Sequence, residues 1–327
     1  MTLEKLRGQL DGIDQRILEL IAERQATIRD IAKVKRSTGL PLRDFKRERE
    51  VFQNARTKAE RVDVSPEVAV SLMRLLIRYS LTQQEKTSLD AHRGGGGQRA
   101  LVIGGAGKMG GWFSQFLFSQ GFEVEVADPR AAAGASAIAD WRQSDLEHDY
   151  IIVATPLGAT NLILQELAAR RPRGVVLDLG SLKSPLRTGF EALRAAGVRV
   201  SSIHPMFGPD VDLLSGRHVV FIDLGNADAL DRARALFAPT MAEQLVTSLE
   251  EHDRLIAYVL GLSHAVNIVF FTALAECGET APELLKLSST TFDAQFNIAR
   301  DVAQESPALY YEIQRLNDFG AESLDAL

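Results

Sequence analysis

The feature that most restricts the fold of this chain is the turn Gly105-Ala106-Gly107-Lys108-Met109-Gly110, which lies between a β-rich run at residues 100–103 and a helical pattern. In a G-x-G-x-x-G turn the first glycine permits the tight bend, the second lets the backbone approach a phosphate, and the third lets the helix pack closely on the strand. The N-terminus of that helix offers free N–H groups and a partial positive charge to a pyrophosphate. The turn therefore predicts a dinucleotide site, and the remaining alternative is a glycine-rich turn without a ligand.

The sequence changes character at a run of four glycines, residues 94–97. Beyond this run, β-rich segments alternate with helical patterns, which is typical of a doubly wound parallel sheet. The further β-rich segments are residues 122–127, 151–154, 175–179, 198–203 and 218–222. From about Leu249 they cease, and an apolar helical stretch follows at 255–275. We predict a dinucleotide-binding Rossmann domain (α/β) at residues 98–247 and an all-α substrate and dimerisation domain at residues 248–327.

Before the glycine run the sequence is helical throughout. Periodicity predicts one long helix from Leu3 to Ser37, ended by Gly39 and Pro41, then a second helix from near Asp44 and a third that ends near Ser88. Three helices with one very long member rarely close a core alone. We therefore predict an all-α domain at residues 1–92 and expect it to pair with a second copy in a homodimer.

Composition limits the classes of function. The single cysteine, Cys277, excludes a disulfide within the chain and suits a reducing compartment. Without a signal-peptide pattern or a run of 18 apolar residues, we expect a cytoplasmic protein with no membrane span. Residues 1–92 carry 18 Lys and Arg against 14 Asp and Glu, and the remainder carries 19 against 29, which indicates two modules or chance. This basic excess is too small for nucleic acid, and we expect no nucleic-acid partner and no metal.

The residue that ends the second β-rich segment bears on the choice of cofactor. Asp128 stands there, 23 residues after Gly105. A carboxylate at this place accepts hydrogen bonds from a ribose hydroxyl and repels a 2′-phosphate. The position favours NAD over NADP, although Arg130, two residues on, weakens that preference.

A stripe on the first predicted helix carries two cations where an apolar face is expected. Its members recur at steps of 4, 3, 4, 3 and 4, the spacing of one buried stripe. They are Ile17, Ile21, Arg24, Ile28, Ile31 and Lys35. Because an unpaired buried charge is strongly unfavourable, two alternatives remain: internal pairs with Asp44 or Glu48, or an anionic ligand whose carboxylates are held by arginines. Arg7 lies roughly 25 Å before Arg24 along the helix axis, so both could reach one small ligand only in a dimer.

These segments resemble two enzymes. Residues 1–90 are similar to the all-helical class of chorismate mutase, and residues 99–327 resemble prephenate dehydrogenase. This is the order found in the bifunctional chorismate mutase–prephenate dehydrogenase of tyrosine biosynthesis. The stretches that carry the resemblance are residues 41–49 (PLRDFKRER), 81–84 (LTQQ), 102–110 (VIGGAGKMG) and 204–209 (HPMFGP).

For the helical domain, the resemblance implies a chorismate site. Arg24 and Arg47 match arginines that hold the two carboxylates, and Arg7 matches one that reaches in from the partner subunit. Lys35 and Gln84 match the residues that hydrogen-bond the ether oxygen. Further polar contacts match Asp44, Glu48 and Ser80. The reaction is pericyclic, so the site must fold the substrate and stabilise negative charge that grows on the ether oxygen, without a nucleophile or base.

For the dehydrogenase, the resemblance implies that His204, after the fifth β-rich segment, accepts a hydrogen bond from the substrate's ring hydroxyl while hydride leaves the same carbon. Ser181 resembles a serine that touches this histidine and the substrate, and Arg300 matches an arginine that binds the substrate carboxylate. His264 either lines the pocket or is a core histidine. Residues 251–253 (EHD) either form a motif of this family or mark a helix start. Because the imidazole must be neutral, activity should rise as pH passes its pKa.

We therefore expect a bifunctional enzyme that rearranges chorismate to prephenate, then oxidises and decarboxylates prephenate to 4-hydroxyphenylpyruvate with NAD. One alternative is a monofunctional prephenate or arogenate dehydrogenase whose N-terminal helices are a non-catalytic dimerisation or regulatory module. The intact set of polar residues in those helices argues against it. Another is a nucleotide-sensing binding protein, which would bind the cofactor without reducing it in the presence of prephenate.

Overall fold

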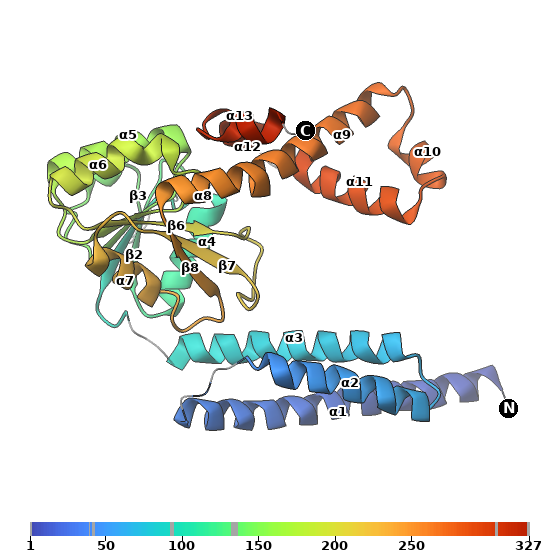
Figure 1. Cartoon of the computed structure of the whole chain (residues 1–327). Coiled ribbons are helices and arrows are strands. Elements are labelled where there is room, and N and C mark those ends of the chain that lie inside the picture. Colours follow the sequence, from blue (N-terminus) through green and yellow to red (C-terminus); the bar gives the residue numbers. More distant parts are fainter. Residues whose placement is uncertain are drawn as a thin grey trace. The chain divides into compact units, whose positions relative to one another are not determined.

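A computed structural model describes most of the chain (Figure 1). The described residues are 2–38, 40, 43–91, 95–131, 137–304 and 307–325. The predictions that fall on Gly39, Pro41, Leu42 and Gly94 lie outside them. The chain divides into two compact units, and the smaller contains residues 1–93, 210–217 and 237–243. The rest of the chain, including both the sheet and the C-terminal helices, forms the larger unit. The three domain boundaries drawn from the sequence stay a prediction.

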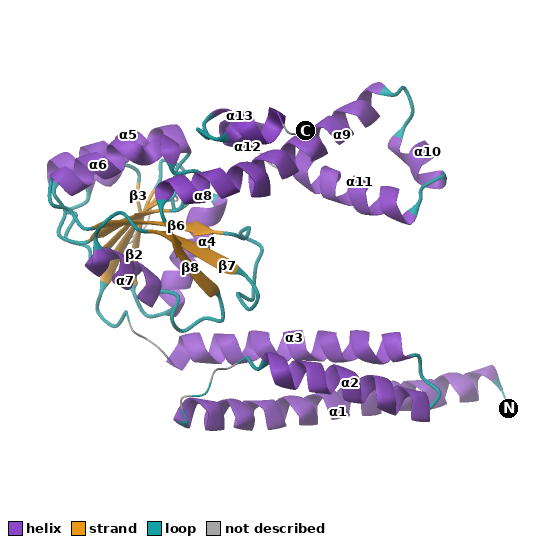
Figure 2. Ribbon diagram, in the orientation of Figure 1, coloured by secondary structure: helices purple, strands orange, loops and turns teal. Residues whose placement is uncertain are grey.

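The smaller unit is helical (Figure 2). Its helices are α1 (Leu3–Ser37), α2 (Phe45–Arg61) and α3 (Pro66–Ala91), so the predicted extent of the first helix is confirmed. The carboxylate of Asp44 accepts a hydrogen bond from the Arg47 N–H at 2.9 Å, which caps the start of α2. Pro66 takes the first helical position of α3, where its missing N–H removes no hydrogen bond. Ala32 of α1 and Ala59 of α2 are buried.

The larger unit is built on an eight-stranded sheet in the order β3-β2-β1-β4-β5-β6-β7-β8. Its strands are β1 (Arg99–Ile103), β2 (Glu123–Ala127), β3 (Ala137–Ile138), β4 (Tyr150–Val153), β5 (Val175–Asp178), β6 (Val200–Pro205), β7 (His218–Ile222) and β8 (Glu243–Thr247). The pairs from β3 to β6 are parallel, and β7 runs antiparallel to β6. The predicted doubly wound sheet is confirmed. The sequence missed β3, which has two residues, and β8, which is largely exposed and has no apolar run.

Helices cover both faces of this sheet (Figure 1). They are α4 (Lys108–Ser119), α5 (Leu157–Arg170), α6 (Arg187–Ala195) and α7 (Ala227–Ala235). Leu101, Ile151, Val176 and Val200 stand in register across four strands and pack in one core cluster with residues of α5 and α6. The direction of winding reverses between β1 and β4, and ligands bind at the carboxyl ends of strands beside such a point.

After β8 the described chain is entirely helical, as predicted. The elements are α8 (Leu249–Ile256), the π-helix η3 (Ala257–Leu262), α9 (Ser263–Glu276), α10 (Ala281–Lys286), α11 (Thr290–Ala303), α12 (Pro307–Arg315) and α13 (Gly320–Asp325). The first three form one continuous run. By length and composition alone, the run Leu249–Glu276 could cross a membrane, and 22% of its apolar window is buried. The expectation of no membrane span stays a prediction.

Candidate active sites

The glycine-rich turn connects β1 to α4 and depends on glycine at two places. Gly104 has a φ of +87°, a conformation that side chains disfavour. A Cβ on Gly110 would lie 2.9 Å from the Gly105 Cα and would overlap the Gly104 carbonyl oxygen. The tight bend assigned to Gly105 is therefore made by Gly104. Gly105 instead lets β2 approach, since its Cβ would lie 2.6 Å from Val126.

The turn fits a dinucleotide. Gly107 is the N-cap of α4 and, within the described residues, no side chain caps that helix. Its first N–H groups are therefore available to an anion, as the phosphate cradle requires. Lys108 is exposed and Met109 is half-buried at the start of the helix, so both predicted contacts lie where a pyrophosphate would bind.

Asp128 lies at the carboxyl end of β2, as the sequence predicted, and is 3% exposed. It accepts hydrogen bonds from the Ala106 N–H at 3.2 Å and from the Arg130 N–H and guanidinium at 2.9 to 3.3 Å. Burial opposes ionisation, but the hydrogen bonds from Arg130 prevail and lower the pKa of Asp128. The carboxylate is thus ionised beside the glycine turn, and Arg130 partly neutralises it.

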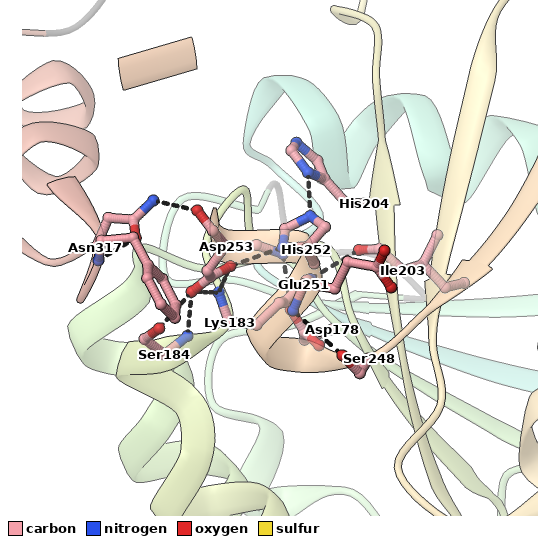
Figure 3. Close-up of polar contacts among 12 residues, drawn as sticks. Asp178, Lys183, Ser184, Ile203, His204, Ser248, Glu251, His252, Asp253 and Asn317 are labelled. Atoms are coloured by element: carbon pink, nitrogen blue, oxygen red, sulfur yellow. Dashed lines mark hydrogen bonds and ion pairs between the residues drawn. The ribbon is translucent and has the colours of Figure 1, made fainter. Parts of the chain in front are cut away.

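A second polar cluster lies at the same edge of the sheet (Figure 3). His204 belongs to β6 rather than to the loop after it, because the strand extends to Pro205 and His204 pairs with Val220 of β7. The His204 Nδ1 lies 2.9 Å from the Nε2 of His252, which comes from α8. The His252 Nδ1 lies 2.6 Å from the Asp253 carboxylate. Side chains from a strand and a helix far apart in the sequence therefore form one chain of polar contacts.

The Asp253 carboxylate is held by several donors. The Lys183 N–H donates to both oxygens at 3.0 and 3.1 Å. The Ser184 N–H and hydroxyl donate to Oδ2 at 2.6 and 2.5 Å. The Asn317 amide donates to the Asp253 carbonyl at 2.9 Å. These contacts fix the carboxylate that faces His252.

A buried ion pair between Lys183 and Asp178 lies next to this cluster. The Lys183 ammonium is fully buried and donates to the Asp178 carboxylate at 2.8 Å and to the Ile203 carbonyl at 3.0 Å. Ile203 immediately precedes His204, so the lysine ties the end of β5 to the backbone beside the histidine. Burial lowers the pKa of Lys183, and the Asp178 charge opposes that shift.

The environment keeps both histidines neutral. Burial, then His252 and the positive charge of Lys183, lower the pKa of His204 well below its usual value. Burial also lowers the pKa of His252, against the hydrogen bond to Asp253. A neutral imidazole is the form that accepts a hydrogen bond, as the sequence analysis required of His204.

The other residues predicted for the dehydrogenase lie outside this cluster. Ser181 is half-buried after β5, but its side chain makes no hydrogen bond to any described residue; Ser184 contacts the cluster instead. His264, on α9, is half-buried and packs edge-on against Tyr310 with ring centroids 4.6 Å apart. Arg300 is exposed on α11, 3.4 Å from its neighbour Asp301. The contact predicted between Ser181 and His204 stays a prediction.

In the helical unit, the structure brings three of the predicted residues to facing sides of α1 and α3. The Arg24 guanidinium donates to the Ser80 hydroxyl at 2.7 Å and to the Leu76 carbonyl at 3.3 Å. Gln25, which the sequence analysis did not single out, donates to the same hydroxyl at 3.1 Å. Gln84, one turn after Ser80, is buried, and its Oε1 has no hydrogen-bond partner within the described residues. Burial lowers the pKa of Arg24.

The other residues predicted for the mutase site make contacts elsewhere or are exposed. Glu48 pairs with Arg43 through both oxygens at 2.9 and 3.2 Å, whereas the guanidinium of Arg24 donates to Ser80. Arg47 is exposed and pairs with Glu50 at 2.9 Å. The N–H of Arg47, and after it the charge of the half-buried Lys35, lower the pKa of the α2 cap residue Asp44. Arg7 is exposed near the start of α1.

Comparisons with protein families agree with both clusters. Residues 6–85 match the family "Chorismate mutase type II". Residues 122–246 match "Prephenate dehydrogenase, nucleotide-binding domain", and residues 248–327 match "Prephenate dehydrogenase, dimerization domain". The chain belongs to the bifunctional chorismate mutase–prephenate dehydrogenase family. The nucleotide-binding match begins at residue 122, after the glycine turn, so the turn rests on its own geometry.

Individual relatives match the whole chain or one of its parts. The T-protein of Enterobacter agglomerans is 27% identical over 319 residues, which cover 95% of this chain and 81% of the relative. A chorismate mutase of Methanocaldococcus jannaschii is 30% identical over 84 residues, which cover 26% of this chain and 85% of the relative. The structure of prephenate dehydrogenase from A. aeolicus in complex with hydroxyphenyl propionate and NAD+ aligns with a TM-score of 0.58 at 20% identity, over 70% of this chain and 86% of that one. That likeness supports the fold.

Sequence reasoning missed several polar residues of the dehydrogenase cluster. Asp178 and Lys183 have no motif of their own, and pairing between residues five apart across a turn is visible only in three dimensions. For residues 251–253 the helix-start interpretation is confirmed, and the family-motif interpretation stays a prediction. The Ser248 hydroxyl caps α8 by accepting from the Glu251 N–H at 3.2 Å, while His252 and Asp253 are buried in the cluster.

Proposed function

We propose that the helical unit rearranges chorismate to prephenate and that the larger unit oxidises and decarboxylates prephenate with NAD. The observation that carries the dehydrogenase assignment is the position of His204. It lies at the carboxyl end of a parallel strand, on the sheet edge that also carries the glycine turn, and is held neutral by its surroundings. The mutase assignment rests on the cluster of the half-buried Arg24 with the buried Ser80 and Gln84.

In the mutase, the chain supplies positioning and charge. Arg24, oriented by Ser80, would hold one carboxylate of chorismate, and Arg47 would hold the other after leaving Glu50. Lys35 and Gln84 would donate to the ether oxygen as its bond to the ring breaks and negative charge grows there. The unpartnered oxygen of Gln84 supports a polar ligand that completes this site. Asp44 and Glu48 would contact the ring hydroxyl or the carboxylates.

In the dehydrogenase, His204 would accept a hydrogen bond from the ring hydroxyl of prephenate through Nε2. NAD, when bound, supplies the hydride acceptor. As hydride leaves the ring carbon, the imidazole stabilises positive charge that develops on its hydroxyl, and loss of the ring carboxylate as CO₂ then aromatises the ring. Arg300 and His264 would bind the substrate carboxylates and line the pocket, and Ser181 would contact the substrate. Prephenate is preferred to arogenate because the same chain makes it.

The residues at the proposed cofactor site favour NAD over NADP. Gly105, Gly107 and Gly110 form the cradle, with Lys108 and Met109 at the start of α4, and the ionised Asp128 would bind the ribose hydroxyls. The A. aeolicus structure that shares this fold holds NAD+, which supports the same choice here.

The active form would be a cytoplasmic homodimer. In α1, Leu6, Leu10, Ile13 and Ile17 recur at steps of 4, 3 and 4 and are all at least 41% exposed, which is an uncovered coiled-coil seam. In the C-terminal helices, Tyr258, Val259 and Val269 are likewise exposed. A second copy would cover both surfaces, in keeping with the match to a dimerisation domain. If the chain were instead monomeric and bound to lipid vesicles, the run Leu249–Glu276 would be a membrane segment.

The decisive test supplies chorismate and NAD to the whole chain and follows NADH absorbance. We expect NADH to form, because each unit must act in turn. His204→Asn should abolish NADH formation and leave chorismate consumption unchanged, since the two clusters lie in separate units. NADH from added prephenate but not from chorismate would mean that the helical unit is a non-catalytic module. Cofactor binding without any reduction would exclude the dehydrogenase.

A further inference from the structure

His252 and Asp253, which follow His204 in the chain of polar contacts, determine which atom donates in each of its hydrogen bonds. Asp253 is a carboxylate whose pKa is lowered by hydrogen bonds from His252 and Ser184, against the effect of burial. A carboxylate only accepts, so the His252 Nδ1, 2.6 Å away, must carry a hydrogen. Neutral His252 then has an unprotonated Nε2, which accepts from the His204 Nδ1 at 2.9 Å. In neutral His204 the remaining hydrogen is thereby placed on Nδ1, and Nε2 is left as an acceptor.

We infer that His252 and Asp253 are positioning residues that hold His204 in the tautomer whose Nε2 accepts from substrate. This rests on the proposed dehydrogenase function and names how the site selects its reactive form. The Nε2 of His204 bonds to no other residue in the described part of the chain, and Figure 3 shows that nitrogen directed away from the cluster. The opposite tautomer would present a donor to the hydroxyl and could not accept from it.

We call the hydrogen-bonded series His204–His252–Asp253 the relay. Its Asp253 end is held in place by several donors. The Asp253 Oδ2 receives two donors from Ser184 and one from Lys183, so the carboxylate cannot rotate away from His252. The charged groups near His204 are Asp253 on α8 and the Lys183–Asp178 pair after β5. The Lys183 charge lowers the pKa of His204, and Asp253 is the carboxylate that contacts His252 behind it. Through His252, this carboxylate would stabilise positive charge that develops on His204 when the hydroxyl donates to it.

A purely structural role for Asp253 is the competing explanation. Its contacts with Lys183 and Ser184 would hold the turn after β5 against α8 whether or not His252 were present. That explanation predicts lower stability but an unchanged kcat for the molecules that remain folded. It does not account for the contact between two neutral, buried imidazoles.

Asp253→Asn separates the two explanations. Oδ2 faces three donors, so the amide oxygen takes that place and the amide nitrogen faces His252. The His252 Nδ1 must then accept, its Nε2 donates to His204, and the His204 Nε2 carries the hydrogen. We expect kcat for prephenate oxidation to fall at least about 100-fold, with the KM for prephenate unchanged. Chorismate mutase activity of the same sample reports on folding of the helical unit, and circular dichroism reports on the larger unit.

The matched control is Glu251→Gln. Glu251 is the neighbouring carboxylate on α8, is exposed, and accepts from the Thr247 hydroxyl at 2.8 Å. Its loss changes the charge by the same amount without touching the relay, so kcat should stay at the wild-type value. A wild-type kcat in folded Asp253→Asn would overturn the inference. Wild-type enzyme that fails to oxidise prephenate would instead overturn the proposed function.

A second variant serves if Asp253→Asn does not fold. His252→Ala removes the middle of the relay and leaves space for one imidazole. We expect a loss of kcat that added imidazole partly restores, and no such restoration in His204→Asn. An unchanged kcat in His252→Ala, or a loss that imidazole leaves as it was, would overturn the inference.

Discussion

At the scale of single residues, burial decides the charge state of the histidines. His148, His204 and His252 are each at most 5% exposed. Burial lowers the pKa of all three, although they lie in different surroundings. His148, just before β4, lies 3.1 Å from Glu125, but burial and the charge of Arg99 outweigh that carboxylate. The catalytic requirement for a neutral imidazole is thus met by packing.

The same shifts predict how stability depends on pH. In the unfolded chain these histidines regain a pKa of about 6.5, so below that pH the unfolded state binds more protons than the folded state. The free energy of unfolding should therefore be highest above pH 6.5 and fall as pH decreases, by up to about 1.4 kcal/mol per pH unit for each histidine. Urea midpoints at pH 7.5 and 5.5 measure this. His148→Gln should show a smaller difference, and equal wild-type midpoints would contradict the assignment.

At the scale of elements, the contact between β1 and α4 shapes the cofactor site. The helix starts so close to the strand that a Cβ on Gly110 would overlap the backbone of Gly104 and Gly105. That approach directs the first N–H groups of α4 toward the turn. A strand, a left-handed Gly104 and a helix without a side-chain cap among the described residues together make the phosphate cradle.

Gly110→Ala tests this contact. The added Cβ would overlap the Gly104 carbonyl, so α4 must move away from the turn. We expect the KM for NAD to rise at least about tenfold, equivalent to ~1.4 kcal/mol, with mutase activity unchanged. The control is Gly111→Ala, whose Cβ would meet only the Gly105 carbonyl oxygen at 3.4 Å. Equal KM values for the two variants would show that close packing of α4 does not govern cofactor binding.

At the scale of the whole molecule, we expect one chain alone to leave the proposed mutase site incomplete. Arg7 and Arg24 lie on one straight helix, too far apart to hold the same small substrate. The exposed seam on α1 indicates that a second copy packs there. In such a dimer, Arg7 of one chain would complete the site built around Arg24 of the other.

Mixing two inactive variants tests this arrangement. Arg7→Ala and Arg24→Ala should each lose most mutase activity when alone. After the two are unfolded together and refolded at equal amounts, half of the dimers would be mixed, and each mixed dimer would contain one intact site. We expect roughly a quarter of wild-type mutase activity to return. Activity no greater than the sum of the separate variants would place both arginines in the same chain's site.

The sequence by itself determined the elements and the family. Periodicity and helix-ending or turn-forming residues were enough for α1, for a helix start near Asp44, for six of the strands and for the glycine turn, because helices, parallel strands and tight turns each impose a local residue pattern. The candidate site residue Arg24 came from a charged helix stripe, and Ser80 and His204 came from the family resemblance. Their partners could not be named from either source.

Only the tertiary structure decided which side chains meet. It placed His252 and Asp253 of α8 behind His204 of β6, set the Lys183 ammonium against Asp178, and brought Ser184 against the Asp253 carboxylate. It also paired Glu48 with Arg43 rather than with Arg24. Such contacts depend on how elements far apart in the sequence pack, and a local pattern carries no record of that packing. Protonation follows from the same packing, because burial and neighbouring charges set each pKa.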